Sequence, residues 1–257
     1  MRKSLIGAAV GGLVVTAGLG ASAFAHPNTY TVSVGGSSAA GTHLFYASDV
    51  SGIAFSVNNG STTTPMSCAN VNAEGNIYSG SGVDPIARIT PVTLVNAPNI
   101  VTPVDKPAQA TEWKDCVGPF NLAMSVNQLN TWEVHATGAV TSGSDTSVAG
   151  YISGPNDGPL RAQVYATSGG KSGTSCNFVV EGYADGNFNE ATQSLNVTET
   201  GFSGDLTIVS AAGNCLGLVT VGSKANFTGS FEFGTDSASN TKGNITVNHP
   251  VNLISSP

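Results

Sequence analysis

Charged side chains are scarce in this 257-residue chain: Asp, Glu, Lys and Arg together make up 10% of it, and aromatic residues make up 7%. Without runs rich in Leu, Glu, Lys and Arg, the sequence excludes coiled coils and long surface helices. Basic residues are especially few, since nine of them face 16 acidic ones and the formal net charge is −7. An acidic chain without a basic patch argues against nucleic acids and anionic lipids as partners.

Motifs of the common catalytic and metal sites are also missing. The chain has no G-x-S-x-G, H-E-x-x-H or C-x-x-C sequence, and GGKSG at 169–173 fails as a phosphate loop because Tyr165 replaces its first glycine. Glu181, Asp185 and Glu190 could offer oxygen ligands to Ca²⁺, but they lack EF-hand spacing, and we interpret them as ordinary turn residues. We therefore predict no catalytic residues, no cofactor and no metal site. A Ser–His–Asp site assembled from separate loops stays open; the histidines are His26, His43, His135 and His249.

A long hydrophobic run is found only near the N-terminus. Two basic residues precede the apolar segment LIGAAVGGLVV at 5–15, and AFA at 23–25 has the A-x-A pattern of a signal-peptidase site. We predict a signal peptide over residues 1–25, cleavage after Ala25 and a secreted product. A retained membrane anchor is the alternative, but the run is short and rich in Gly and Ala, and no later run is long enough to span a bilayer.

The four cysteines indicate disulfides, because an even number in an exported chain usually pairs. Four cysteines allow three pairings. SCANVNAEG at 67–75 aligns with SCNFVVEG at 175–182 with one gap, and each segment is followed by a Cys-x-Gly turn. The match is short, so chance similarity is the alternative to a true repeat. Two matched halves would each close on themselves, which predicts the disulfides Cys68–Cys116 and Cys176–Cys215.

Period-two alternation of apolar and polar residues predicts strands along most of the chain. In NFTGSFEF at 226–233, for example, the three phenylalanines share one face. Clusters such as NNGS at 58–61, ADGN at 184–187 and NEATQ at 189–193 predict the turns between strands. We predict an all-β fold, an antiparallel β-sandwich of about 12–14 short strands, with barrel-like closure as an open alternative. Other alternating segments lie at 120–127, 132–136, 194–198 and 244–248.

Residues 26–257 are predicted to form one domain with two weakly repeated halves, about 26–152 and 153–257. No Pro- or Ser-rich linker separates the halves, because SGPNDGP at 153–159 has the composition of a turn. Two smaller domains are the alternative.

Residues 96–115 contain three prolines and no strand periodicity. They are predicted to form a long surface loop that ends at Cys116. Trp113 lies in this segment and is the candidate ligand contact, because exposed aromatic residues often anchor a binding partner. The alternative is that Trp113 packs over the disulfide.

Several motifs together resemble those of a known family. The resemblance is to a widespread family of small secreted actinobacterial β-proteins and covers about residues 53–250. No activity is established for that family, so the resemblance implies a secreted β-protein and transfers no functional residue. The chain departs from the family pattern at Gln193, where a glycine is usual. The similar motifs are CVGPF at 116–120, TWEVHATG at 131–138, EGYADGNFNEATQ at 181–193 and GNCLGLV at 213–219.

These observations favour a secreted, non-catalytic binding protein that acts outside the cell or at its surface. Its partner is predicted to be an extracellular ligand or a cell-envelope component of unknown identity. The alternative is a secreted hydrolase whose active site is dispersed along the sequence. A cluster of His with Asp or Glu in one cleft would favour that alternative.

Overall fold

A computed structural model describes residues 30–91, 111–137, 147–169, 175–200, 205–213, 215–234 and 243–248. The predicted signal peptide and most of the predicted 96–115 loop lie outside these ranges. The described residues form sixteen antiparallel strands and three short 3-10 turns. The strands are β1 (Tyr30–Val34), β2 (Gly41–Asp49), β3 (Ile53–Asn58), β4 (Thr63–Val83), β5 (Ala87–Ile89), β6 (Thr111–Val117), β7 (Ala123–Gln128), β8 (Trp132–Ala136), β9 (Ser147–Ser153), β10 (Leu160–Ala166), β11 (Asn177–Gly182), β12 (Ala184–Asn189), β13 (Ser194–Glu199), β14 (Thr207–Ala212), β15 (Lys224–Gly234) and β16 (Ile245–Asn248). The turns are η2 (Pro119–Asn121), η3 (Pro155–Asp157) and η4 (Thr167–Gly169).

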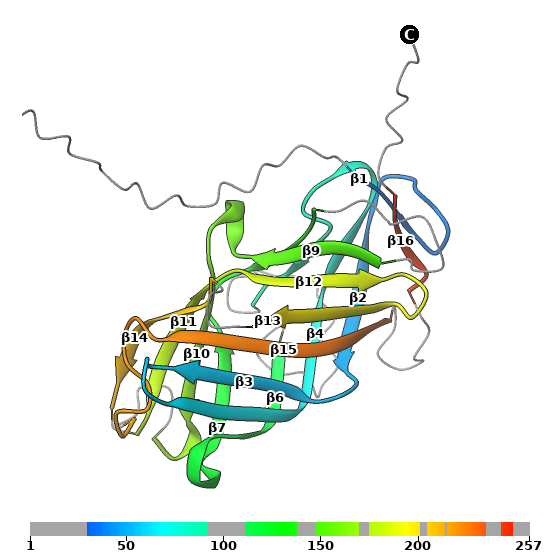
Figure 1. Cartoon of the computed structure of the whole chain (residues 1–257). Coiled ribbons are helices and arrows are strands. Elements are labelled where there is room, and N and C mark those ends of the chain that lie inside the picture. The colour runs from blue at the N-terminus through cyan, green and yellow to red at the C-terminus, as the bar shows by residue number, and fades with distance from the viewer. Residues whose placement is uncertain are drawn as a thin grey trace, which may run out of the picture.

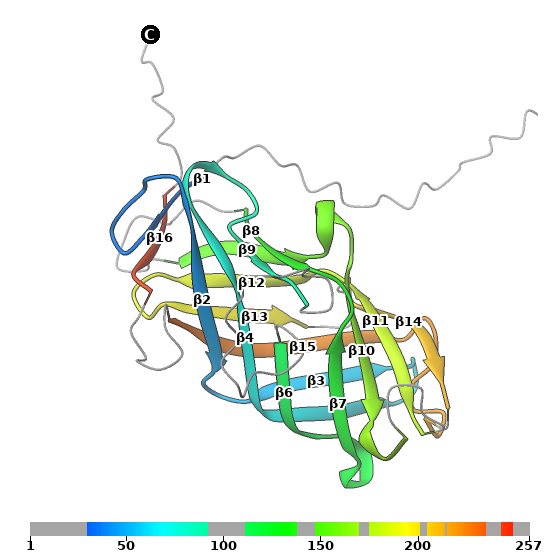
Figure 2. The ribbon, with the colours of Figure 1, turned by 180° about the vertical axis from the view of Figure 1, so that it is seen from behind.

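The strands lie in two layers whose directions cross. β9, β12, β13, β15 and β3 run across the front of Figure 1, and β2, β6, β7, β10 and β11 run behind them and come to the front in Figure 2. The pairing closes on itself twice. One ring runs from β4 through β5, β8, β9, β12, β13, β15 and β2, and the other from β4 through β6, β7, β10, β11, β14, β15 and β3. The predicted all-β, antiparallel, sandwich-like fold is therefore confirmed.

β4 belongs to both layers. It pairs with β3 along its first part and with β2 along its later part, and it bends between them (Figures 1 and 2). The inward positions shift at the bend, because Cys68 and Val71 are buried whereas the two residues between them are exposed. The Asp49 carboxylate holds the bend, since it accepts hydrogen bonds from the backbone N–H of Gly52 at 2.8 Å and of Val71 at 2.5 Å.

Both predicted disulfides are present. Cys68 on β4 faces Cys116 on β6, with Cα atoms 3.9 Å apart. Cys176, just before β11, is bonded to Cys215, which follows β14, with Cα atoms 4.4 Å apart. Each bond therefore ties two segments that already lie side by side in the sheet.

The aligned segments that predicted the disulfides also share a structural use of glycine. A Cβ atom on Gly75 would lie 2.1 Å from the carbonyl oxygen of Arg88. A Cβ atom on Gly182 would lie 2.2 Å from the carbonyl oxygen of Asp205. Both glycines therefore allow another part of the backbone to pass at a distance that no side chain permits.

Several local predictions were wrong where alternation breaks or turn chemistry is misleading. Residues 111–115 belong to strand β6 and not to a surface loop. ADGN at 184–187 lies inside β12, because this segment pairs with β9 on one side and β13 on the other. Phe120 is not on the apolar face of a strand but in η2, with a φ of 57° and 84% of its surface exposed. The strands are also not all short, since β4 has 21 residues.

Strand pairs connect the two halves of the chain. β15 pairs with β2 and β3, and β1 pairs with β16. Both rings therefore contain strands from residues 26–152 and from 153–257, and the single domain stays a prediction. Among the residues that the structure describes, no helix has the length and apolarity that a membrane span requires.

Candidate functional site

An apolar cavity of about 110 Å³ lies between the two layers. Strands of both rings contribute to its wall. No Asp, Glu, Lys, Arg or His side chain is among the described residues that line it. The wall is rich in aromatic rings, which come from Phe45, Phe55, Trp113, Trp132, Phe227, Phe231 and Phe233.

Trp113, the candidate ligand contact of the sequence analysis, lies in the wall of this cavity. It sits on β6 opposite Val71 of β4. Its ring packs edge-to-face against Phe227, with centroids 6.2 Å apart and an interplanar angle of 69°. The residue is therefore partly buried in a strand, and the prediction that it projects from a surface loop was wrong. Its role as a ligand contact stays a prediction.

Two buried polar atoms of wall residues have no hydrogen-bond partner among the described residues, and neither is exposed to the cavity, whose surface is apolar. They are Thr111 Oγ1 and Trp113 Nε1, and Thr111 is only 3% exposed. The two residues are two positions apart on β6, so their side chains share one face of the strand. Each unpaired atom costs about 1–3 kcal/mol. Trp132, the other tryptophan in the wall, does have a partner, since its indole N–H donates to the carbonyl of Arg161 at 3.3 Å.

A second group of functional side chains surrounds His135 on β8. Its Nδ1 lies 2.7 Å from Asp84 Oδ1, and its Nε2 lies 3.0 Å from Ser153 Oγ. The Tyr151 ring stacks on the imidazole, with centroids 4.7 Å apart. Burial, followed by the charges of Asp157 and Asp84, raises the pKa of Tyr151. The structure thus joins a serine, a histidine and an aspartate in the order of a hydrolase triad.

This triad-like group lacks room for a substrate. Ser153 is 0% exposed and His135 is 3% exposed. The Ser153 hydroxyl donates to the carbonyl of Gly154 at 2.8 Å, and the cavity of about 40 Å³ beside His135 is not lined by Ser153. A nucleophilic serine needs space for a carbonyl carbon next to its oxygen. We interpret the group as a hydrogen-bonded tie between β8, β9 and the turn that follows β4.

Glu133 extends the same buried polar region. It accepts a hydrogen bond from Arg88 Nε at 2.7 Å and another from the backbone N–H of Asn156 at 3.2 Å. Alternation in 132–136 correctly places Trp132 and Val134 on one face and Glu133 and His135 on a second, but the structure leaves the first face partly buried and buries the second. The second face is buried because these polar side chains find partners within the protein.

The three acidic residues that we considered as Ca²⁺ ligands, Glu181, Asp185 and Glu190, each contact different groups. Glu181 forms an ion pair with Arg161 at 2.5 Å, and Glu190 accepts a 2.6 Å hydrogen bond from a backbone N–H of β16. The backbone N–H of Asp185 donates to Glu199 at 3.3 Å. Burial raises the pKa of Asp185, Glu190 and Glu199. Within the described ranges, no group of three His, Cys, Asp or Glu residues is arranged to hold a metal ion.

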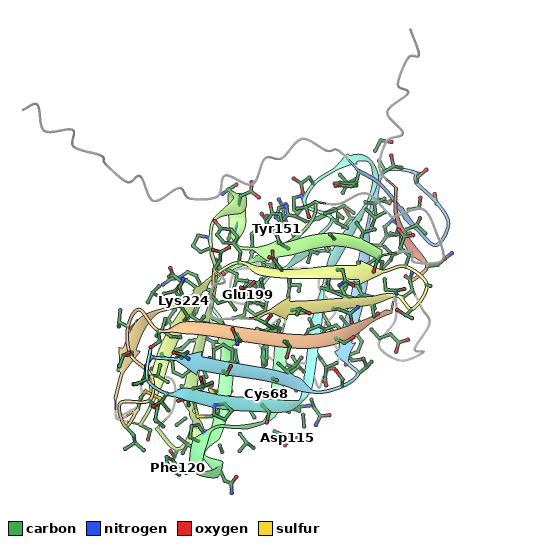
Figure 3. All side chains as sticks on the ribbon, in the orientation of Figure 1. Cys68, Asp115, Phe120, Tyr151, Glu199 and Lys224 are labelled. Carbon is green, nitrogen blue, oxygen red and sulfur yellow. A yellow bond between two sulfur atoms is a disulfide. The ribbon has the colours of Figure 1, made fainter. Side chains whose placement is uncertain are left out.

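The two Cys-x-Gly turns meet at one end of the molecule. Pro119 and Phe120, which follow the first of them, and Cys215 and Leu216 of the second line a shared surface hollow of about 40 Å³, to which Leu122 also contributes. Phe120 is 84% exposed and Leu216 is 62% exposed. Figure 3 shows Phe120 at this end, far from Tyr151. We call Phe120, Leu122 and Leu216 the apolar tip; Cys215 lines the same hollow, so its disulfide fixes the base of the tip.

The sequence analysis singled out Trp113 of the cavity wall because of its aromatic ring, but it did not single out Thr111, which lies two positions away. Thr111 and Trp113 alternate with Glu112 and Lys114, so a strand signal was present but was hidden by the proline-rich segment before it. The grouping of His135 with Asp84 and Ser153 depends on pairing between distant strands, for which no local signal exists. Comparison with family models, with curated proteins and with solved structures finds no match.

Proposed function

We propose that the protein is an exported, non-catalytic binding protein that holds a small molecule in the cavity between its two layers. The observation that carries this proposal is the cavity itself, whose surface is apolar and whose wall is rich in aromatic rings. Small-molecule sites are typically concave and apolar, with a few placed polar groups that orient the ligand. An apolar ligand in this cavity would be removed from water and packed against these side chains.

Export is the second part of the proposal. It rests on the signal-peptide pattern of residues 1–25, which lie outside the described residues, and on the cleavage site after Ala25. Two disulfides and no free cysteine are compatible with an extracellular protein, because disulfides persist in oxidising compartments. The ligand is then a molecule of the extracellular medium or of the cell envelope.

Tryptophan fluorescence of the mature protein tests cavity binding directly. The chain has two tryptophans, Trp113 and Trp132, and both line the cavity. A small apolar probe such as cyclopentane is expected to change their emission saturably and to raise the thermal unfolding midpoint. Absence of both effects would contradict the proposal.

A cavity-filling variant supplies the control for this experiment. Ala73 lines the cavity directly opposite Thr111, so Ala73→Leu should fill it and abolish the fluorescence change while the protein remains folded. Ala54→Leu on β3 makes the same substitution at an exposed position and should leave binding intact. Equal binding by both variants would show that the probe occupies another place.

A secreted serine hydrolase is the second candidate function. The hydrogen-bonded series Asp84–His135–Ser153 favours it, and the complete burial of Ser153 opposes it. An alkyl fluorophosphonate distinguishes the two functions, because an activated serine oxygen displaces its fluoride and forms a stable phosphonate ester. We expect no labelling of the folded protein. Stoichiometric labelling that disappears in Ser153→Ala would favour the hydrolase.

A further inference from the structure

We propose that the apolar tip inserts into the surface of a bilayer of neutral or zwitterionic lipid. This site is separate from the cavity, because none of the three residues of the tip lines the cavity wall. The proposal follows from four properties of this end of the molecule: its exposed apolar side chains, the backbone conformation that presents them, its lack of charge, and its area.

Large apolar side chains are exposed where the chain turns at this end. Phe120 lies in η2, the turn between β6 and β7 at the lower end of the molecule in Figure 1, and Figure 3 labels it there. Leu216 belongs to the connection between β14 and β15, and Val221 of the same connection is also exposed. Leu216 and Val221 line a second surface hollow of about 330 Å³. Two loops from distant parts of the chain therefore bring exposed apolar side chains together.

The backbone at both loops has a conformation that large side chains rarely adopt. Phe120 has a φ of 57° and Leu216 a φ of 54°. Gly and Asn adopt such left-handed φ values more readily than bulky residues do. Neither side chain offsets this cost by packing in the core, since both are exposed. An unfavourable conformation that leaves a large apolar side chain in water points to a contact outside the protein.

The two loops are also held firmly at their bases. A disulfide-bonded cysteine precedes each loop directly. The backbone N–H of Gly118 donates to the carbonyl of Leu122 at 2.8 Å and closes the first loop. Asn59 Nδ2 donates to the carbonyl of Gly217 at 2.9 Å and ties the second loop to the hairpin between β3 and β4. The apolar side chains are thus in place before any contact forms, so binding costs little ordering.

Charge selects the kind of surface. The loop segments at this end, 58–62, 117–122 and 215–222, contain no Asp, Glu, Lys, Arg or His. The whole chain is acidic, with a formal net charge of −7. An anionic bilayer repels an acidic protein, and these segments offer no basic side chain to offset the repulsion. A hydrocarbon layer under headgroups without net charge matches the uncharged, apolar tip.

The area of the tip argues against a second copy of the chain as the partner. Together with Val221, the tip exposes on the order of 500 Å², whereas a stable protein interface buries about 800 Å² on each partner. A protein partner would also need a hollow that matches the projecting Phe120. A fluid bilayer needs no matching shape, because its lipids rearrange around an inserted side chain.

Co-flotation with vesicles tests the proposal. The protein is used without its predicted signal peptide, so that the apolar run at 5–15 does not contribute. We expect reversible binding to phosphatidylcholine vesicles, with a partition coefficient on the order of 10³–10⁴ M⁻¹, no larger than that of a single acyl chain. Binding to vesicles that are half phosphatidylglycerol should be about three-fold weaker or less at low salt. Absence of binding to phosphatidylcholine at millimolar lipid, or tighter binding to the anionic vesicles, would overturn the proposal.

Two substitutions test the assigned side chains without disturbing the fold. Phe120→Asn and Leu216→Asn introduce a polar side chain that adopts the same φ readily. Each should lower the partition coefficient about five-fold or more, with an unchanged or higher thermal unfolding midpoint. Leu44→Asn on β2 is the matched control, since Leu44 is exposed but lines neither hollow, and it should bind as the wild type does. Full binding by both tip variants, or an equal loss in the control, would contradict the assignment.

The variant Phe120→Trp reports where the tip lies when the protein is bound. On phosphatidylcholine vesicles its emission should shift to shorter wavelength and be quenched by lipids brominated on their acyl chains. Trp113 and Trp132 line the cavity, so the wild-type protein, measured in parallel, should show neither effect. Bound protein without quenching at position 120 would place the contact elsewhere and reject insertion of the tip.

Two further measurements separate this proposal from the alternatives. Ala73→Leu, which fills the cavity, should bind vesicles as the wild type does, and a loss of binding would assign the lipid contact to the cavity instead of the tip. Sedimentation equilibrium without lipid should show a monomer. A dimer that dissociates in Phe120→Asn would assign the tip to a second copy of the chain and overturn the lipid contact.

Discussion

The buried position of Glu199 favours the neutral form of its carboxyl over the charged form. It lies on β13 and is 6% exposed (Figure 3). Burial raises the pKa of its carboxyl, hydrogen bonds from the backbone N–H groups of Asp185 and Asp205 oppose the rise, and the charges of these two carboxylates add to it. A carboxyl whose pKa is raised by folding stabilises the folded state below its unfolded pKa, and this stabilisation is lost as the pH rises through the folded pKa.

We therefore predict that Glu199→Gln raises the thermal unfolding midpoint at neutral pH. The difference from the wild type should shrink as the pH falls and vanish near pH ~3, where the wild-type carboxyl is protonated in both states. Calorimetry of both proteins from acid to neutral pH checks this, with Glu232→Gln on β15 as a variant at a less buried carboxylate. A difference that does not change with pH would contradict the assignment to this ionisation.

Ser153 provides a second test at the scale of one residue. Its hydroxyl is the partner of His135 Nε2 at 3.0 Å and is fully buried. Ser153→Ala leaves the imidazole nitrogen without that partner, so the free energy of unfolding should fall by about 1–3 kcal/mol. Urea denaturation measures the loss, and Ser210→Ala at an exposed position of β14 should have almost no effect. Equal stability of the two variants would argue against our interpretation of the His135 group as a structural tie.

At the scale of elements, strands with clean alternation could be predicted and bent strands could not. The alternating runs at 194–198 and 226–233 became β13 and part of β15. β4 was not predicted as a strand. Its buried positions shift between Cys68 and Val71, so no single alternation of buried and exposed residues fits its whole length. β6 shows the matching shift, with Asp115 at a φ of 52° between Trp113 and Cys116. The bends in a closed sheet are set by pairing with other strands, and the local alternation of apolar and polar residues does not indicate them.

The candidate site was predictable only in part for the same reason. Trp113 could be chosen from the sequence because it is an aromatic residue near a cysteine, but the direction of its side chain depends on the bends in β4 and β6. Thr111 has no distinctive signal in the sequence, and its place in the cavity wall follows from its pairing with Ala73 of β4. The disulfides were predictable because the repeat that indicated them consists of residues with fixed backbone requirements, such as Gly75 and Gly182.

The role of the bend in β4 can be tested through Asp49. Its carboxylate accepts two backbone hydrogen bonds, from Gly52 and Val71. Because hydrogen bonds to a charged group are worth about 1.5–3 kcal/mol each, Asp49→Ala should lower the free energy of unfolding by about 2 kcal/mol or more. Chemical denaturation measures this loss, and the neighbouring Ser48→Ala should change stability by less than about 0.5 kcal/mol. A loss no larger than that of Ser48→Ala would show that the bend forms without Asp49.

For the whole molecule, shared strands predict a single unfolding transition. β4 and β15 belong to both rings, so neither half of the chain can keep a closed ring when the other unfolds. Thermal unfolding followed by tryptophan emission, which reports on the cavity wall, should coincide with unfolding followed by far-ultraviolet circular dichroism. Two separated transitions would instead favour two domains.

The closure of both rings through β15 also affects the order in which the chain can fold as it is made. Phe231 of β15 pairs with Asp49 of β2, and Thr228 pairs with Ala54 of β3. Contacts between residues so distant in sequence form slowly, and all-β proteins of this kind fold in about milliseconds to seconds. Neither ring can close before the ribosome has added β15, near the end of the chain. If the proposed export takes place, such a delay would keep the chain in the open, threadable state that a translocation channel accepts.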